Sequence, residues 1–132
     1  YIGVGKMAYA ERRNKIGIKE AINAIHSAKG FAFIAHPGVY NNFGIIEFIE
    51  YFIKNDGDGI ETYYDYESSR DKLSKSDSNK INAKFKKIAR EHKLLETGGS
   101  DFHGKEGQIL GALIVPYSVL EKLKKAVASK HI

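Results

Sequence analysis

Phe-Ala-Phe-Ile-Ala-His-Pro-Gly, residues 31–38, joins a short apolar run to a polar turn. Five apolar residues without polar alternation predict a strand that is covered on both faces, as in a parallel sheet. Pro37 and Gly38 end this strand with a turn. Pro37 also predicts extended backbone at the residue before it, which would aim the His36 side chain in a fixed direction.

The segments on either side repeat the same pattern of helix followed by strand. Helical spacing of apolar residues starts at Ile18 and runs to a terminating Gly30. Further helices are predicted over residues 43–54, over 79–92 and from Pro116 onward, and strands over 60–64, 94–97 and 112–115. Residues 65–78 read as a long polar surface loop. This alternation predicts an α/β protein with a mostly parallel sheet.

Length and composition exclude several classes of protein. The chain has 132 residues, 42% hydrophobic and 28% charged, which is ordinary for a water-soluble globular domain. It contains no Cys, so thiol nucleophiles and cysteine zinc sites are ruled out. No apolar run is long enough for a membrane span, and we expect a cytoplasmic protein that does not bind membranes. A complete (β/α)8 barrel needs about 250 residues, so any barrel signature here would belong to part of a larger domain.

Each predicted strand is followed by polar residues that could bind a ligand. His36 follows the first strand, Glu61, Asp65 and Glu67 come from the second, and Asp101 and His103 follow the third. The carboxyl ends of parallel strands meet at one rim, so these groups predict a metal site. Carboxylate oxygen and imidazole nitrogen together suit Mn, Zn or Fe.

Simpler interpretations of these residues also fit the sequence. His36 could cap its strand through a backbone hydrogen bond. The stretch from Gly98 to Gly104 could be a glycine-rich turn with an Asx bond at Asp101 and an exposed His103. A spacing of two places Asp101 and His103 on the same side only if this segment is extended.

The other histidines and the basic residues give weaker signals. We expect a structural role for His26, an interaction with the helix dipole for His92, and none for His131 in the terminal tail. The formal net charge is +5, which favours anionic substrates such as phosphate esters or nucleic acid. Loop residues such as Arg12 and Arg70 are better placed for such contacts than the lysines on helix surfaces.

Two histidine motifs each follow a predicted strand: His36-Pro37-Gly38 and the stretch from Gly98 to Gly104. These motifs resemble those of the PHP (polymerase and histidinol phosphatase) superfamily. The likeness is strongest to its small stand-alone phosphoesterases, and it extends over nearly the whole chain through these segments in order: residues 1–9, Glu20-Ala21-Ile22, Ala35-His36-Pro37-Gly38, Gly59-Ile60-Glu61 and residues 97–104. The resemblance implies a distorted (βα)7 barrel with two or three divalent metals at its carboxyl rim. It also implies that His36, Asp101 and His103 are metal ligands.

Two departures from the family pattern affect this interpretation. The family begins with a His-x-His pair, another His and a bridging Glu, and none of these precedes His36. Residues 1–132 are therefore expected to be the C-terminal part of one PHP domain whose upstream half is absent. In addition, many relatives carry a histidine where this chain has Glu67, which could replace that residue at a metal or phosphate site.

The expected function is hydrolysis of phosphate esters of nucleotides or short RNA ends by a metal-activated water. The isolated chain should be weakly active or inactive, and the surfaces exposed by truncation should favour self-association. Two alternatives remain open at this stage. One is a non-catalytic binding or regulatory module on a degenerate PHP scaffold, and the other is a basic nucleic-acid binder without chemistry.

Overall fold

The computed structural model describes residues 15–40, 44–68, 73–104, 106 and 108–130. Within these ranges the elements run in the following order: α1 (Ile18–Ser27), β1 (Phe33–Ile34), the 3₁₀ turn η1 (Pro37–Tyr40), α2 (Ile45–Lys54), β2 (Gly59–Tyr63), α3 (Lys75–Glu91), β3 (Leu95–Gly98) and α4 (Tyr117–Lys130). None of these helices is both long and apolar enough to cross a membrane. The expected α/β class is confirmed.

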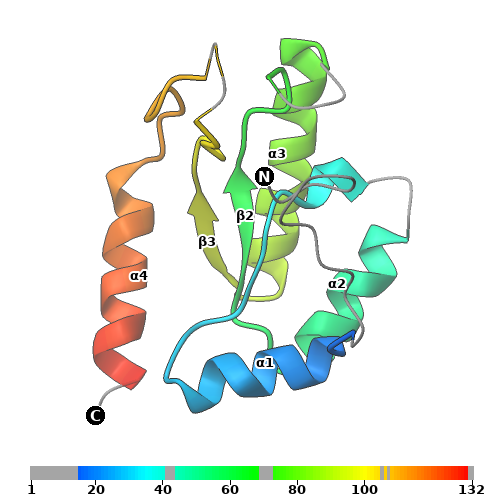
Figure 1. The fold of residues 1–132 in the computed structure, drawn as a ribbon, viewed down its shortest axis with the longest axis vertical. Coiled ribbons are helices and arrows are strands. Elements are labelled where there is room, and N and C mark those ends of the chain that lie inside the picture. The colour runs from blue at the N-terminus through cyan, green and yellow to red at the C-terminus, as the bar shows by residue number, and fades with distance from the viewer. Residues whose placement is uncertain (1–14, 41–43, 69–72, 105, 107, 131–132) are drawn as a thin grey trace, which may run out of the picture.

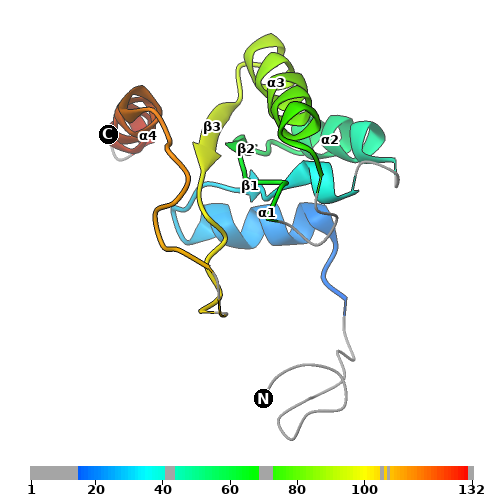
Figure 2. The same ribbon diagram turned by 90° about the horizontal axis from the view of Figure 1, so that it is seen from above.

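The three strands form one parallel sheet in the order β1-β2-β3. Figure 1 shows β2 and β3 side by side and pointing the same way, with α3 behind them and α4 beside β3. Seen from above in Figure 2, α3, α2 and α1 follow one another around the strands, while α4 lies beyond β3. Helices α1, α2 and α3 therefore lie along one side of the sheet.

The core lies between these three helices and the sheet. It is built from buried apolar residues of α1, β1, α2, β2 and α3, together with Ala32. Ile60 of β2 and both Phe85 and Ala89 of α3 are fully buried. Packing of α1, α2 and α3 against one core explains why the apolar spacing predicted all three helices. α4 contributes only Val119 to the buried residues that the structure describes.

Helices α1, α2 and α3 end in the same way. The residues Lys29, Asp56 and Lys93 have left-handed backbone, with φ of 59°, 64° and 56°. In each case the next amide donates to a carbonyl five residues back, as from Gly30 to Ile25 (2.9 Å). This is the Schellman arrangement, and it turns the chain from each helix toward the following strand.

Three predicted elements differ from the structure. The first strand covers only Phe33–Ile34 of the apolar run at residues 31–35. Residues 112–115 form no strand, so the described sheet has three strands instead of four. The third helix begins at Lys75 and not at Asn79, because Ser74 caps it by accepting a hydrogen bond from the Asp77 amide (3.1 Å). A serine at this position satisfies an otherwise unpaired helix amide, and the serine-rich composition concealed the start.

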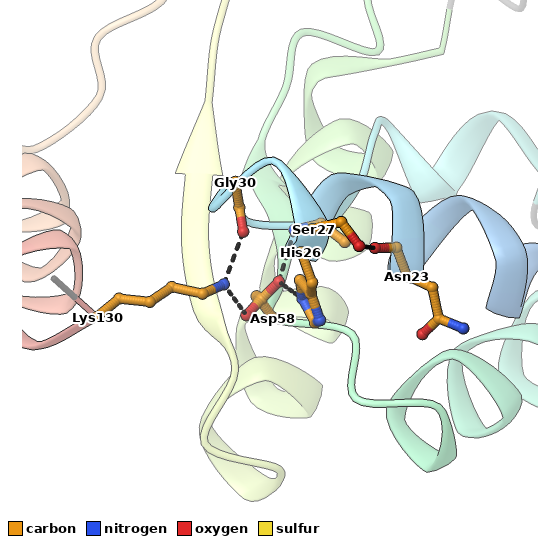
Figure 3. Close-up of polar contacts among 7 residues, drawn as sticks. Asn23, His26, Ser27, Gly30, Asp58 and Lys130 are labelled. Carbon is orange, nitrogen blue, oxygen red and sulfur yellow. Dashed lines mark hydrogen bonds and ion pairs between the residues drawn. The ribbon is translucent and has the colours of Figure 1, made fainter.

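A polar cluster lies at the end of the sheet where the strands begin (Figure 3). Asp58 Oδ2 accepts hydrogen bonds from His26 Nε2 (2.7 Å) and from the Ala32 amide (2.6 Å). Lys130 donates to the Gly30 carbonyl (2.6 Å) and lies 3.7 Å from Asp58 Oδ1. This cluster attaches the end of α4 to the rest of the fold, and it confirms the structural role expected for His26.

Candidate functional site

The loops that follow the three strands meet at one end of the sheet, as the sequence predicted. A cavity of about 550 Å³ lies there. Its lining includes His36 after β1, Tyr64 after β2, and both Asp101 and His103 after β3. The structure thus places the three predicted ligands around one cavity. Among the residues that the structure describes, however, no three carboxylate or imidazole side chains come close enough to hold a metal ion by themselves.

His36 occupies a strained turn. Its φ is 31°, so the extended backbone predicted from Pro37 is wrong. The reason is that neighbouring groups fix the turn: the Glu61 carboxylate accepts a bond from the His36 amide (2.6 Å), and the Tyr66 hydroxyl accepts one from the Gly38 amide (3.0 Å). A Cβ atom at Gly38 would lie 2.5 Å from Tyr66, so only glycine fits there.

The His36 imidazole has a ring nitrogen that makes no hydrogen bond among the described residues. Its Nδ1 atom is buried and has no hydrogen-bond partner among the described residues. Its ring packs on Tyr64, with centroids 5.3 Å apart. A buried nitrogen without a hydrogen-bond partner costs free energy of folding. In native proteins a bound ion or ligand is one explanation for such an atom. The simple strand cap that the sequence also allowed requires a ring nitrogen bonded to a backbone carbonyl, and Nδ1 makes no such bond within the part of the chain that the structure describes.

Asp101 and His103 form a close pair. Asp101 Oδ1 lies 3.0 Å from His103 Nε2, and Asp101 Oδ2 accepts a hydrogen bond from the Tyr64 hydroxyl (3.1 Å). The segment is not extended, since φ at Asp101 is 47°, yet the two side chains meet. Phe102 is 46% exposed between them.

The structure places Glu67 outside the cavity. Glu67 is exposed in a turn in which Asp65 Oδ1 accepts bonds from the amides of Glu67 (3.0 Å) and Ser68 (3.3 Å). Asp65 and Ser68 line the cavity, whereas Glu67 does not belong to its lining. The structure therefore does not bring Glu67 together with His36 and Asp101. Arg12, Arg70 and His131 lie outside the described residues.

Burial shapes the acid–base properties of this region. Burial raises the pKa of Glu61, although the bond from the His36 amide partly opposes the shift. Burial, followed by the hydrogen bond to Asp101, raises the pKa of Tyr64. Burial also raises the pKa of Tyr66 to about 12. Both tyrosines are therefore neutral hydroxyl groups at neutral pH, and Tyr64 can donate to a carboxylate.

The donors present fit one side of a divalent metal site. An imidazole with a free buried nitrogen and an aspartate–histidine pair are ligands that Mn, Zn and Fe accept. Sequence reasoning placed Glu61 at this rim but not its bond to the His36 amide, and it missed the supporting residues Tyr64 and Tyr66. Alternation of tyrosines after a buried strand would have been their only signal, and it is equally typical of ordinary sheet packing.

Comparison with known proteins finds hydrolases. No family model matches the chain. The sequence is 30% identical over 105 residues to the 5'-3' exoribonuclease Rnm of Escherichia coli (strain K12). The matched segment covers 78% of this chain and 32% of Rnm. The chain thus spans about a third of the length of this curated relative.

Two solved structures share the fold. A presumed metal-dependent phosphoesterase from Bifidobacterium adolescentis superposes with a TM-score of 0.64 at 24% identity, over 91% of this chain and 40% of that one. An amidohydrolase from Chromobacterium violaceum, solved with bound sulfate and no metal, gives a TM-score of 0.62 at 26% identity over 98% of this chain and 42% of that one. Each of these neighbours is therefore more than twice as long as the segment it shares with this chain.

Proposed function

We propose that this chain is the C-terminal part of a PHP-type barrel and supplies part of a metal site for phosphate-ester hydrolysis. Three parallel strands with helices arranged around one side are the expected remainder of such a barrel. The sequence match to an exoribonuclease and the structural match to a presumed metal-dependent phosphoesterase support the reaction class.

The observation that carries the proposal is the backbone at His36 and Asp101. Five non-glycine residues in the described ranges have positive φ, and three of them end helices in Schellman motifs. The other two are His36 and Asp101. Left-handed backbone costs on the order of 1–2 kcal/mol for a side chain such as that of His36 and less for Asp, and strained backbone of this kind clusters at functional sites. Both His36 and Asp101 line the same cavity.

In the proposed site His36, Asp101 and His103 would be ligands, and further ligands would come from residues outside this chain. A bound divalent ion supplies an activated water and neutralises phosphoryl oxygens during an in-line displacement. The chain's own part is to fix its ligands: Glu61 holds the His36 amide, and Tyr64 holds the Asp101 carboxylate. The net charge of +5 favours an anionic substrate, and we propose a nucleotide or a short RNA end.

The test uses the complete protein that contains this chain, assayed with Mn²⁺ on a nitrophenyl phosphodiester, a nitrophenyl phosphomonoester and a short 5'-phosphorylated RNA. Asp101→Ala should abolish hydrolysis, since it removes a ligand and the partner of His103. Glu50→Gln, an exposed change on α2, should leave the activity unchanged. Full activity in Asp101→Ala would contradict the assignment of this site.

An inactive wild-type protein would instead favour a binding module on a degenerate scaffold. The placement of Glu67 outside the cavity is the observation that keeps this second function open. The upstream sequence of the parent protein separates the two, because a catalytic PHP protein should carry a His-x-His motif there.

A further inference from the structure

Tyr64 lies between the proposed ligands of two different strands. Its hydroxyl donates to Asp101 Oδ2 (3.1 Å), and its ring packs on the His36 imidazole at 5.3 Å and 51°. One side chain from the end of β2 thus touches the residues that follow β1 and β3.

Tyr64 is itself held firmly. It is 7% exposed, and its ring packs on Tyr66, which is 1% exposed, with centroids 4.7 Å apart. Its backbone is clamped by Asn82 of α3, whose Nδ2 donates to the Tyr64 carbonyl (2.8 Å) and whose Oδ1 accepts from the Tyr64 amide (3.3 Å). Burial of the ring and the two backbone hydrogen bonds therefore fix the position of the Tyr64 hydroxyl.

The two oxygens of Asp101 are divided between two partners. Oδ2 accepts from Tyr64, and Oδ1 faces His103 Nε2 at 3.0 Å. Bonds to different oxygens fix the rotation of the carboxylate plane, which a single bond would not do. Groups that orient a ligand in this way commonly change metal affinity by about 10- to 100-fold when they are removed.

We propose that Tyr64 is a positioning residue that orients Asp101, through its hydroxyl, and His36, through its ring, toward a divalent cation. The proposal rests on the proposed function, because it takes these two residues as ligands. Phenylalanine keeps the ring and its packing but cannot bond to Asp101, so Tyr64→Phe isolates the contribution of the hydroxyl.

The experiment is a Mn²⁺ titration of the 132-residue chain, followed by paramagnetic broadening of the amide NMR signals of residues 99–104. Tyr64→Phe should shift the midpoint of broadening to about 10-fold higher Mn²⁺. Tyr63→Phe is the matched control, since it removes a hydroxyl from the adjacent tyrosine, whose ring faces Lys86 Nζ at 3.7 Å instead. It should leave the midpoint unchanged.

A second readout needs no metal. If Tyr64 orients Asp101, the His103 imidazole ¹⁵N signals of the metal-free chain should change in Tyr64→Phe and stay the same in Tyr63→Phe. Equal Mn²⁺ midpoints in wild type and Tyr64→Phe would overturn the positioning role and leave the metal site standing. Absence of broadening in the wild type at millimolar Mn²⁺ would overturn the positioning role, whereas the proposed function is tested separately by the hydrolysis assay of the complete protein. Loss of the native amide spectrum in Tyr64→Phe would also overturn the positioning role, because the hydroxyl would then support the fold.

Discussion

Asp58 and His26 are 32 residues apart in sequence, and they meet at 2.7 Å at the end of the sheet opposite the cavity (Figure 3). Asp58 is 16% exposed at its side chain and also accepts from the Ala32 amide. Lys130 of α4 completes the cluster from the far end of the chain. The contacts between helix, strand and terminal helix therefore converge on one carboxylate.

Asp58→Ala should lower the free energy of unfolding by about 3 kcal/mol, because it leaves the Ala32 amide and the His26 side chain without their acceptor and removes the ion-pair partner of Lys130. Urea denaturation monitored by circular dichroism measures the change. Asp56→Asn is the control: Asp56 is exposed, and asparagine tolerates its left-handed backbone. The control should stay within about 0.5 kcal/mol of wild type. A similar loss in both variants would show that the cluster contributes nothing specific.

The sequence predicted the periodic parts of this fold and the ends of its strands. Apolar spacing located three core helices, and an apolar run ending at His36 located the first strand and the rim of the cavity. The start of α3 was missed because Ser74 looks like any other loop serine until its bond to Asp77 is seen. The prediction of extended backbone at His36 was wrong, because its amide donates a hydrogen bond to the carboxylate of Glu61, which is distant in sequence.

Long-range contacts also explain what could not be predicted at the site. Asp101 and His103 were found because they adjoin a glycine-rich stretch after a strand. Tyr64 and Glu61 act on residues 37 and 25 positions away, respectively, and no local pattern encodes such pairings. Glu67 was assigned by its position in a family motif, but the turn made by Asp65 leaves it exposed.

The left-handed residue at the end of α3 offers a test of the helix-end geometry. Lys93 is exposed with φ of 56°, a conformation that glycine adopts without steric cost. Lys93→Gly should therefore raise the free energy of unfolding by roughly 0.5–1 kcal/mol. Lys93→Ala keeps the Cβ atom and should give no gain. Thermal unfolding of the three proteins decides the matter, and destabilisation by glycine would show that the Lys93 side chain supplies a favourable contact.

The N-terminus of α3 predicts a dependence on pH. Ser74 Oγ accepts from the Asp77 amide and donates to Asp77 Oδ2 (2.8 Å), so Ser74→Ala should cost about 1 kcal/mol at pH 7. Hydrogen bonds from Lys80 and then Ser74 lower the pKa of Asp77 below its usual 3.8. A carboxyl group with a lowered pKa stabilises the fold above its unfolded pKa, and this stabilisation is lost as the pH falls through the folded value.

The difference between wild type and Ser74→Ala should therefore shrink when urea denaturation is repeated below pH 3. The Asp77 amide bond to Ser74 does not titrate, so part of the difference should survive. Ser68→Ala, a change at an exposed serine beside the cavity, serves as the control and should show no such pH dependence. A constant difference between pH 7 and the acid limit would mean that the Asp77 carboxylate adds nothing to the cap.

The β1 edge of the sheet predicts self-association. An apolar groove of about 500 Å³ runs between α1, β1 and α2, and it includes the partly exposed Phe48. In the proposed barrel this groove would be covered by chain outside residues 1–132. An uncovered strand edge beside apolar side chains readily pairs with a second copy. Sedimentation velocity of the chain should therefore show association that increases with concentration.

Phe48→Lys should shift this equilibrium toward monomer, because a charge in the groove opposes burial against a second copy. Phe48 is 39% exposed, so the change should cost little stability in the isolated chain. Ile109→Lys is the control, since Ile109 is 71% exposed and lines the other cavity. Within the complete protein the same Phe48→Lys change should instead be destabilising. Association that is weakened equally by both lysine substitutions would point to a general effect of charge and not to the β1 edge.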